Sequence, residues 1–338
     1  MSRQAHRAVA LLTATALLAG CVSTQAQRIG ADDGTDACRQ YVVQLDSTGN
    51  FFGEDIIRGA AIGAVGGALL GAAVSGRWQG ALIGAAAGGV AGAAGGYLAA
   101  LQQRNQDQAS LNYALAGDLQ RENDQLNTTQ RAFDQLMDCR FKSAQDIRAA
   151  YRSGRIPRDV AEAEMARLRS RTMSDIQLAR QIDQRIGTRG AEFDTAAESV
   201  APGVKKPNTA PQQVAATTAT TRVPVTLRLR PSPDAPDVSQ VPARQAVQLR
   251  PARAGYALVE TSTGQRGYAE ATAFSSPGGR GIGVPAARPG AAPADPIAAA
   301  QPGDVRSLAA SNIARRDNFT AAVADAERAT GSGFELAS

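Results

Sequence analysis

The sequence predicts a mainly α-helical protein with a small all-β domain. Three observations carry this prediction. Glycine recurs at every fourth residue through residues 59–96, apolar residues recur every three or four positions through residues 102–190, and short β-rich pieces separated by Pro, Gly and Asp fill residues 223–275. Because only 4% of the residues are aromatic, we expect several small or elongated parts in the 338-residue chain and no single large enzyme domain.

The first residues have the form of an export signal. Residues 1–20 place Arg3, His6 and Arg7 before a short apolar run and end in Leu-Ala-Gly, directly before Cys21. The sequence Leu-Ala-Gly-Cys resembles the lipobox of bacterial lipoproteins. This resemblance implies cleavage before Cys21, a diacylglycerol on its sulfur and acylation of the new N-terminus, and several acyl chains anchor a protein stably. An ordinary secretory signal followed by a chance cysteine is the alternative.

Removal of the leader would also remove His6, the one histidine of the sequence. We therefore expect no imidazole acid-base catalysis, no triad built on histidine and no His-containing zinc site, and we expect neither an enzyme nor a cofactor. The net charge of +5 is spread over arginines scattered among acids, without a basic block interleaved with aromatic residues. A nucleic-acid partner is therefore not expected.

Two cysteines, Cys38 and Cys139, remain in the expected mature chain. Export places them where disulfides form and persist, so we expect them to pair. Closure of a loop of roughly 100 residues would stabilise the fold by about 4 to 5 kcal/mol in the chain-entropy model. Two separate thiols or an intermolecular bridge are the alternatives.

The glycine-rich stretch has the pattern of two packed membrane helices. Residues 59–76 and 80–101 carry no charged side chain, and each run is about as long as a bilayer-spanning helix of ~20 residues. A turn at Arg77 and Trp78 would set small residue against small residue along both helices, and such faces pack closely in lipid. The predicted helix-packing residues are Gly59, Gly63, Gly67, Gly71, Gly80, Gly84, Gly88, Gly92 and Gly96.

The flanks of this stretch fit a membrane interface. Phe51 and Phe52 precede it and Tyr97 ends it, while Glu54 and Asp55 stand where carboxylates complement a helix dipole. Together with the lipobox, the glycine pattern resembles the two-transmembrane glycine zipper family of bacterial envelope lipoproteins. The resemblance implies a non-enzymatic outer-membrane protein of structural or protective role that oligomerises through its membrane helices. A soluble helical hairpin rich in Ala and Gly is the alternative.

Residues 102–190 predict a coiled-coil-like helical hairpin. The first helix should end near Ser153 and Gly154, and the second should begin near Pro157 and end near Gly187. The apolar stripe is narrow, so we expect it to pack on the twin helix or on another copy. Before the membrane hairpin at 55–101, residues 21–54 are expected to form a lipid-anchored tether.

A small β domain is expected at 223–275, between disordered linkers at 191–222 and 276–303. Its stretches Leu-Arg-Leu-Arg at 227–230, Gly-Tyr-Ala-Leu-Val at 255–259 and Gly-Gln-Arg-Gly-Tyr at 264–268 resemble the bacterial SH3-like domain. Such domains are usually modules that bind peptidoglycan peptides or envelope proteins. Tyr256 and Tyr268 occupy the tryptophan positions of that pattern, and they are candidates for a ligand groove or for the core.

Residues 304–330 predict an amphipathic helix with Asp304 as its N-cap. Taken together, the sequence predicts a non-enzymatic cell-envelope lipoprotein that self-associates through its membrane hairpin. Its expected partners are membrane lipid, further copies of the chain, and peptidoglycan or envelope proteins. Val22 after the lipidated cysteine favours an outer-membrane protein facing the periplasm over an inner-membrane one. An accessory subunit of an envelope channel or secretion complex is the alternative function.

Overall fold

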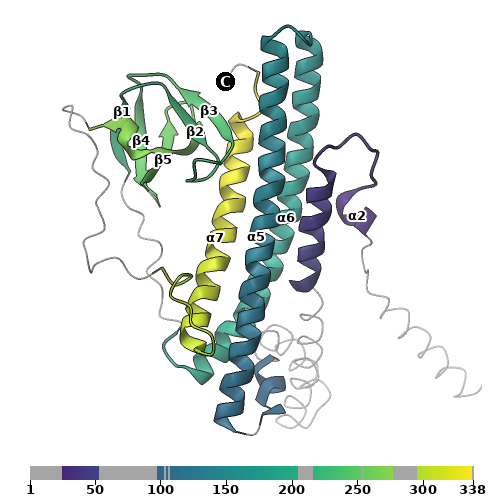
Figure 1. Cartoon of the computed structure of the whole chain (residues 1–338), viewed down its shortest axis with the longest axis vertical. Coiled ribbons are helices and arrows are strands. Elements are labelled where there is room, and N and C mark those ends of the chain that lie inside the picture. Colours follow the sequence, from purple (N-terminus) through teal and green to yellow (C-terminus); the bar gives the residue numbers. More distant parts are fainter. Residues whose placement is uncertain are drawn as a thin grey trace, which may run out of the picture.

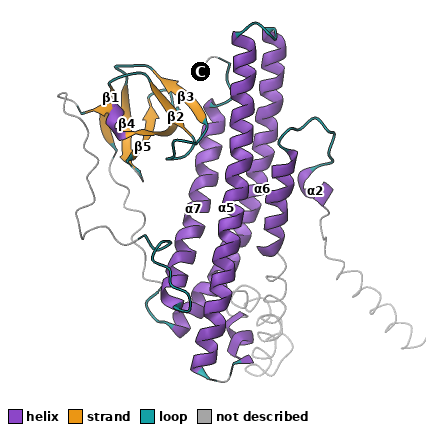
Figure 2. Ribbon diagram, in the orientation of Figure 1, coloured by secondary structure: helices purple, strands orange, loops and turns teal. Residues whose placement is uncertain are grey.

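The computed structural model describes residues 25–52, 97–102, 104–105, 107–204, 216–252, 255–276 and 295–336. Long helices run side by side, and one antiparallel sheet lies against them (Figure 1). Figure 2 shows how helix and strand are segregated into these two parts. The mainly α architecture with a small all-β part is therefore as the sequence predicts.

Two long antiparallel helices form the centre of the molecule. Helix α5 (Gln108–Arg152) begins at Asp107, whose side chain accepts a hydrogen bond from the backbone N–H of Ser110. The turn after α5 uses Gly154 at φ 71°, a conformation that glycine adopts without steric cost. Helix α6 (Arg158–Val200) then starts directly after Pro157, at the predicted place.

Helix α6 continues beyond its expected end near Gly187, so residues 191–200 are not part of a linker. The apolar stripe continues with Phe193, Ala196 and Ala197, which are buried against Leu115 and Leu308. The Arg316 side chain of α7 crosses α6 at Gly190. A Cβ atom at this position would clash with that side chain in its present conformation. Burial of this last stripe outweighs the low helix propensity of the two glycines at 187 and 190.

The C-terminal helix α7 (Val305–Ser332) fills the groove between α5 and α6. Its N-cap is Asp304, as expected, and its carboxylate accepts from the backbone N–H groups of Arg306 and Ser307. Phe319 packs edge-on against Phe133 of α5, with ring centroids 5.7 Å apart. The helical hairpin therefore buries its stripe against a distant segment of the same chain, where the sequence suggested only a twin helix or a second copy.

The N-terminal segment is folded onto the helices and is not a free tether. Helix α2 (Gln25–Ile29) is followed by a loop and by a second helical stretch at 39–52. Val42, Leu45 and Phe52 of that stretch are buried in the same core as Phe133 and Ile182. Because polar residues surround these positions in the sequence, the apolar periodicity is weak and did not indicate a core-forming face.

The sheet has seven antiparallel strands in the order β3-β2-β6-β5-β4-β1-β7. Its core is formed by alternate residues such as Leu227, Val247, Val259 and Phe274. Strand β1 lies inside the predicted linker at 191–222, because Ala219 and Thr221 of this Thr-rich stretch are buried against the neighbouring strands. The strands are β1 (Thr217–Thr221), β2 (Val225–Arg228), β3 (Asp237–Val241), β4 (Ala246–Pro251), β5 (Tyr256–Thr261), β6 (Arg266–Glu270) and β7 (Phe274–Ser275), with a short 3-10 turn η1 (Ala271–Ala273) before β7.

The sheet leans on one side of the helical bundle. Leu229, just after β2, and Val238 of β3 join the core cluster of the helices. Residues 295–300, which were expected to lie in a second linker, form turns ahead of α7, and Ala300 packs on its base. The resemblance of the sheet to an SH3-like barrel stays a prediction.

Candidate membrane-anchoring region

Two aromatic positions flank the glycine-rich stretch on the described side. Phe52 is fully buried, and its ring meets that of Phe51 edge-on with centroids 5.2 Å apart. On the other side of the stretch, Tyr97 begins a short helical segment at 97–102. These positions are the described residues on either side of 53–96, and both pack against the helical bundle.

Both flanks reach the same end of α6. The guanidinium carbon of Arg189 lies 4.8 Å from the ring centroid of Phe51 and 5.4 Å from that of Phe193. The ring of Phe193 in turn lies 4.8 Å from that of Tyr97. Arg189 also pairs with Glu122 of α5, with Nε and Oε2 2.7 Å apart. A cation sandwiched between two aromatic faces thus joins segments that are separated by the whole glycine-rich stretch.

Tyr97 is further fixed by a hydrogen bond. Its hydroxyl donates to a carboxylate oxygen of Asp118 at 2.6 Å. Burial and the neighbouring carboxylate raise the pKa of Tyr97 above its ordinary value. The phenol therefore stays protonated, and this contact persists through the physiological pH range.

The helical stretch 39–52 approaches α6 closely at a glycine. A Cβ atom placed on Gly49 would lie 2.7 Å from the Cγ1 atom of Ile182. The Gln125 side chain donates to the carbonyl of Thr48, and that of Arg185 donates to the carbonyl of Gly49. This stretch therefore runs along the bundle toward the end where Phe51 meets Arg189.

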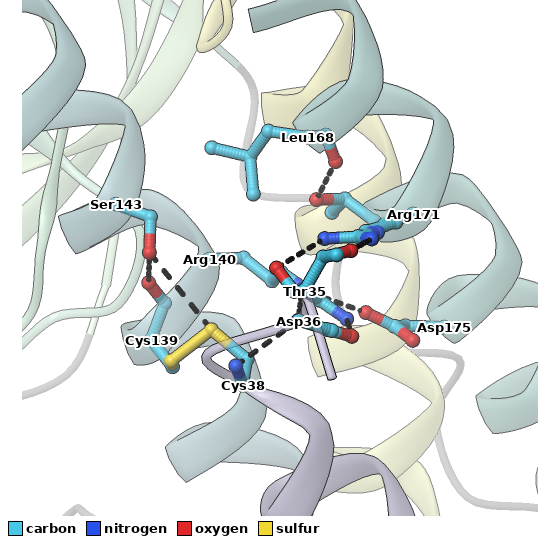
Figure 3. The surroundings of a disulfide bond; sticks show 10 residues. Thr35, Asp36, Cys38, Cys139, Arg140, Ser143, Leu168, Arg171 and Asp175 are labelled. Atoms are coloured by element: carbon cyan, nitrogen blue, oxygen red, sulfur yellow. Dashed lines mark hydrogen bonds and ion pairs between the residues drawn. A yellow bond between two sulfur atoms is a disulfide. The ribbon is translucent and has the colours of Figure 1, made fainter. Parts of the chain in front are cut away.

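A disulfide fixes the N-terminal end of the helical stretch 39–52 (Figure 3). Cys38 and Cys139 are bonded, with Cα atoms 5.9 Å apart, so the expected pairing is confirmed. The bond joins the segment ahead of the glycine-rich stretch to α5. The two cysteines are 101 positions apart in the sequence, and the loop between them contains the entire glycine-rich stretch.

A buried arginine lies beside the disulfide. Arg140, only 2% exposed, donates to both carboxylate oxygens of Asp36 and through Nε to Asp175 at 2.7 Å (Figure 3). Burial alone would raise the pKa of Asp36, but the hydrogen bonds and charge of Arg140 hold it below its usual range. Asp175 is more deeply buried, and this burial raises its pKa to about 6 despite Arg140. The cation thus bridges the N-terminal loop, α5 and α6 with a carboxylate on either side.

A further ion pair and two hydrogen bonds to backbone carbonyls hold the N-terminal segment together. Arg28 of α2 forms a two-pronged pair with the buried Asp46, at 2.6 and 2.8 Å. Arg39 donates to the carbonyls of Ile29, the last residue of α2, and of Gly30, which follows it. Burial of the Asp46 carboxylate without a partner would cost free energy, and the pair with Arg28 compensates its charge.

The two tyrosines proposed for a ligand groove lie in different surroundings. Tyr256 is 7% exposed at the start of β5. Tyr268 of β6 faces α7, and its hydroxyl donates to a carboxylate oxygen of Asp325 at 2.5 Å. Tyr268 lines a cavity between the sheet and the helices, whereas Tyr256 does not.

The remaining predicted residues lie outside the described part of the chain. They are the lipidation site Cys21, the acidic pair Glu54 and Asp55, the turn at Arg77 and Trp78, and the nine helix-packing glycines. Among the helices that are described, none has the length and apolar character needed to cross a bilayer. Within the same residues, no cluster of three or more His, Cys, Asp or Glu side chains could hold a metal ion.

Comparison with known proteins gives one match. Residues 43–100 match the YMGG-like Gly-zipper family. The matched range covers the predicted membrane hairpin at 55–101 except for its last residue, and it includes the described residues Gly49, Phe51, Phe52 and Tyr97. The match supports the glycine zipper and suggests a membrane-associated protein. Neither the curated proteins nor the solved structures contain a match to the chain.

Sequence reasoning missed the side chains that position this region. Arg140 directly follows Cys139, and Asp36 precedes Cys38 by two residues, so opposite charges flank the two paired cysteines. This juxtaposition was visible in the sequence once the disulfide was assumed. Arg189 and Asp175 gave no such signal, because they are ordinary polar positions on a charged helix.

Proposed function

We propose that this protein is a non-enzymatic, membrane-anchored scaffold of the cell envelope. It would insert the glycine zipper at 53–96 into the bilayer, self-associate there, and hold its helical bundle and sheet on the periplasmic side. The family match at 43–100 supports membrane association. Outer-membrane placement, lipidation at Cys21 and binding of peptidoglycan or envelope proteins through the sheet belong to this proposal.

One observation carries the proposal most directly. Phe51 and Tyr97, the residues at the two ends of the zipper, are tied to one end of α6 through Arg189 and Phe193. Two flanks at the same end of the bundle favour an even number of membrane crossings between them, as in a hairpin. The bundle and Cys21 would then lie on the same side of the membrane.

The bundle also gives the sheet a defined place relative to this anchor. Helix α5 has 45 residues, which corresponds to a length of about 65 Å at 1.5 Å per residue. The sheet contacts the C-terminal half of α5, through Asp138 and Gln145, whereas the zipper ends lie near Asp118 and Glu122. The sheet is therefore presented away from the anchoring end (Figure 1), which suits contact with a partner beyond the membrane surface.

Membrane fractionation tests the anchor. In one variant a cleavable secretory signal without a lipid-accepting cysteine replaces residues 1–21. In a second, a Gly/Ser linker of about 15 residues, which spans roughly 20 Å, replaces residues 53–96. We expect either variant alone to sediment with membranes and the combined variant to be soluble in the periplasm. Release of the first variant, whose zipper is intact, would show that the zipper does not insert.

Cross-linking in membranes tests self-association. We expect Gly67→Leu with Gly88→Leu to reduce cross-linked oligomers, because both changes place bulk on the small-residue face. Ala73→Leu with Ala86→Leu is the matched control, since each alanine lies two residues from a ridge glycine and so on the opposite helix face. Equal loss in both pairs would contradict packing through the glycine ridge.

The soluble combined variant serves to test wall binding. We expect this variant to co-sediment with purified peptidoglycan. If the protein stays in the supernatant with its disulfide intact, the role of accessory subunit in an envelope complex is favoured.

A further inference from the structure

A cavity of about 550 Å³ lies where the sheet meets α5 and α7. Its walls come from the end of β2, the end of β4, and the facing sides of the two helices. The volume falls within the range of small-molecule sites, which is about 300–1,000 Å³. Nothing in the proposed scaffold role requires this space.

The floor of the cavity is apolar. Phe133 and Met137 of α5 and Ala326 of α7 are each 1% exposed, and Leu229 from the sheet side is 4% exposed. Leu258 is half-buried and extends this wall along β5. An aliphatic or aromatic body would be removed from water here on several sides.

Two hydrogen-bond acceptors stand on the α5 side of the cavity. Gln130 and Asp134 are one helical turn apart, and the Gln130 Nε2 atom donates to Asp134 Oδ1 at 3.0 Å. This arrangement leaves the Oε1 atom of Gln130 buried, with no hydrogen-bond partner among the described residues. A buried acceptor without a donor costs free energy. A ligand that donates a hydrogen bond to Gln130 Oε1 would remove this cost.

The nearest cation is already engaged. Arg230 donates through both terminal nitrogens to Asp138, at 2.7 and 2.8 Å, and lies 3.8 Å from Asp134. Burial raises the pKa of Asp134 in spite of Arg230, and the charge of Asp138 adds to this effect. Among the described residues, the Asp134 carboxylate pairs with a cation only at this longer distance, because Arg230 is hydrogen-bonded to Asp138. On the sheet side, Arg250 at the end of β4 would repel a cation placed there.

We propose that this cavity binds a small amphipathic amine, with its apolar body against Phe133 and Met137 and its protonated amine donating to Gln130 Oε1 and Asp134. The amine would satisfy the orphaned acceptor and place a positive charge against Asp134 in one contact. The apolar floor excludes strongly hydrated cations that lack a hydrocarbon part. This site is independent of membrane insertion and of any partner of the sheet.

Isothermal titration calorimetry of the full chain in detergent tests the proposal, with hexylammonium as the probe. We expect hexylammonium to bind with a Kd of about 1 mM or tighter, as seven heavy atoms allow. Ethylammonium has the charge without the body, and hexanol and hexanoate have the body without the positive charge. These three compounds should bind at least about tenfold more weakly. Equal binding of hexanol and hexylammonium would overturn the assignment of the amine, and absence of hexylammonium binding would overturn the site.

Two variants locate the binding. Asp134→Asn should weaken hexylammonium binding about tenfold, because it removes the charge of the acceptor and keeps its shape. Asp317→Asn is the matched control, since Asp317 is an exposed carboxylate of α7 outside the cavity. Ala322→Trp should abolish binding by filling the cavity from α7. Circular dichroism verifies that each variant is folded, and unchanged affinity in both Asp134→Asn and Ala322→Trp would contradict the proposal.

Discussion

The N-terminal segment and the sheet are both held against the same helical bundle, but by different means. The N-terminal segment is joined to α5 by a disulfide, by the buried Arg140 between two carboxylates, and by a helical stretch whose apolar face is in the core. The sheet has its own core and reaches the helices through Leu229 and Val238 and through part-buried pairs such as Arg230 with Asp138 and Tyr268 with Asp325, with a cavity beside these contacts. The segment that leads into the glycine-rich stretch is therefore held by a covalent bond and buried ion pairs, whereas the sheet has a core of its own and is held by noncovalent contacts.

This difference suits the proposed function. Force or thermal motion transmitted from a membrane anchor would act first on residues 39–52 and 97–102, which flank the zipper. A covalent bond and buried ion pairs resist local opening there. A binding module, in contrast, gains from an attachment that allows a ligand to enter beside it.

Removal of the disulfide should have the largest effect on the stability of the helical bundle relative to that of the sheet. We expect Cys38→Ala with Cys139→Ala to lower the free energy of unfolding of the helical bundle by about 4 to 5 kcal/mol, because the unfolded chain regains the entropy of a loop of roughly 100 residues. Urea unfolding followed by circular dichroism measures the change. The sheet should keep its own transition, and an equal loss in sheet and bundle would contradict their separation.

Loss of the buried arginine should come next. Arg140→Ala leaves Asp36 and Asp175 facing one another without a cation, and we expect a cost of about 3 to 4 kcal/mol in urea unfolding. Arg158→Ala is the matched control, because the pair of Arg158 with Glu162 is exposed to solvent and should contribute far less to stability. Similar values for the two variants would show that the triad does not fasten the N-terminal loop.

Asp175 should give the bundle a distinct pH dependence. Its pKa is about 6 in the folded protein and about 3.8 in the unfolded chain. Between these values the folded state binds more protons, so the contribution of this group to stability falls as pH rises from 4 to 6, by up to about 3 kcal/mol. We expect Asp175→Asn to remove this fall. Unfolding free energies of both proteins at pH 4, 5, 6 and 7 measure the difference, and parallel curves would contradict the raised pKa.

The sequence predicted those features that depend on local pattern. The α5–α6 hairpin, its turn at Gly154, the cap at Asp304 and most strands follow from periodicity and turn chemistry. The pairing of Cys38 with Cys139 followed from export and from the count of cysteines. These signals are carried by a few neighbouring residues each.

Long-range docking could not be predicted in the same way. That α7 fills the groove of the hairpin depends on contacts such as Asn123 with the carbonyl of Leu308, between residues 185 positions apart. The Thr-rich stretch around Ala219 becomes a strand only because β4 and β7 offer it hydrogen bonds on both sides. Arg140 and Arg189 resemble surface arginines until three segments of chain meet around them.

The smallest expected effect concerns the sheet contact. Tyr268→Phe removes the hydroxyl that donates to Asp325, and we expect a loss of about 1 kcal/mol in the transition that separates the sheet from the bundle. Burial and the nearby carboxylate raise the pKa of Tyr268, so the phenol stays a donor and the loss should be constant from pH 6 to 9. Tyr113→Phe is the matched control, since Tyr113 is 82% exposed.

Hydrogen exchange of the Tyr268→Phe variant, followed by mass spectrometry, should show faster exchange in β2 and β6 and in the facing turn of α7, with protection near Cys38 unchanged. Faster exchange near Cys38 as well would mean that the sheet and the N-terminal segment are parts of one cooperative unit.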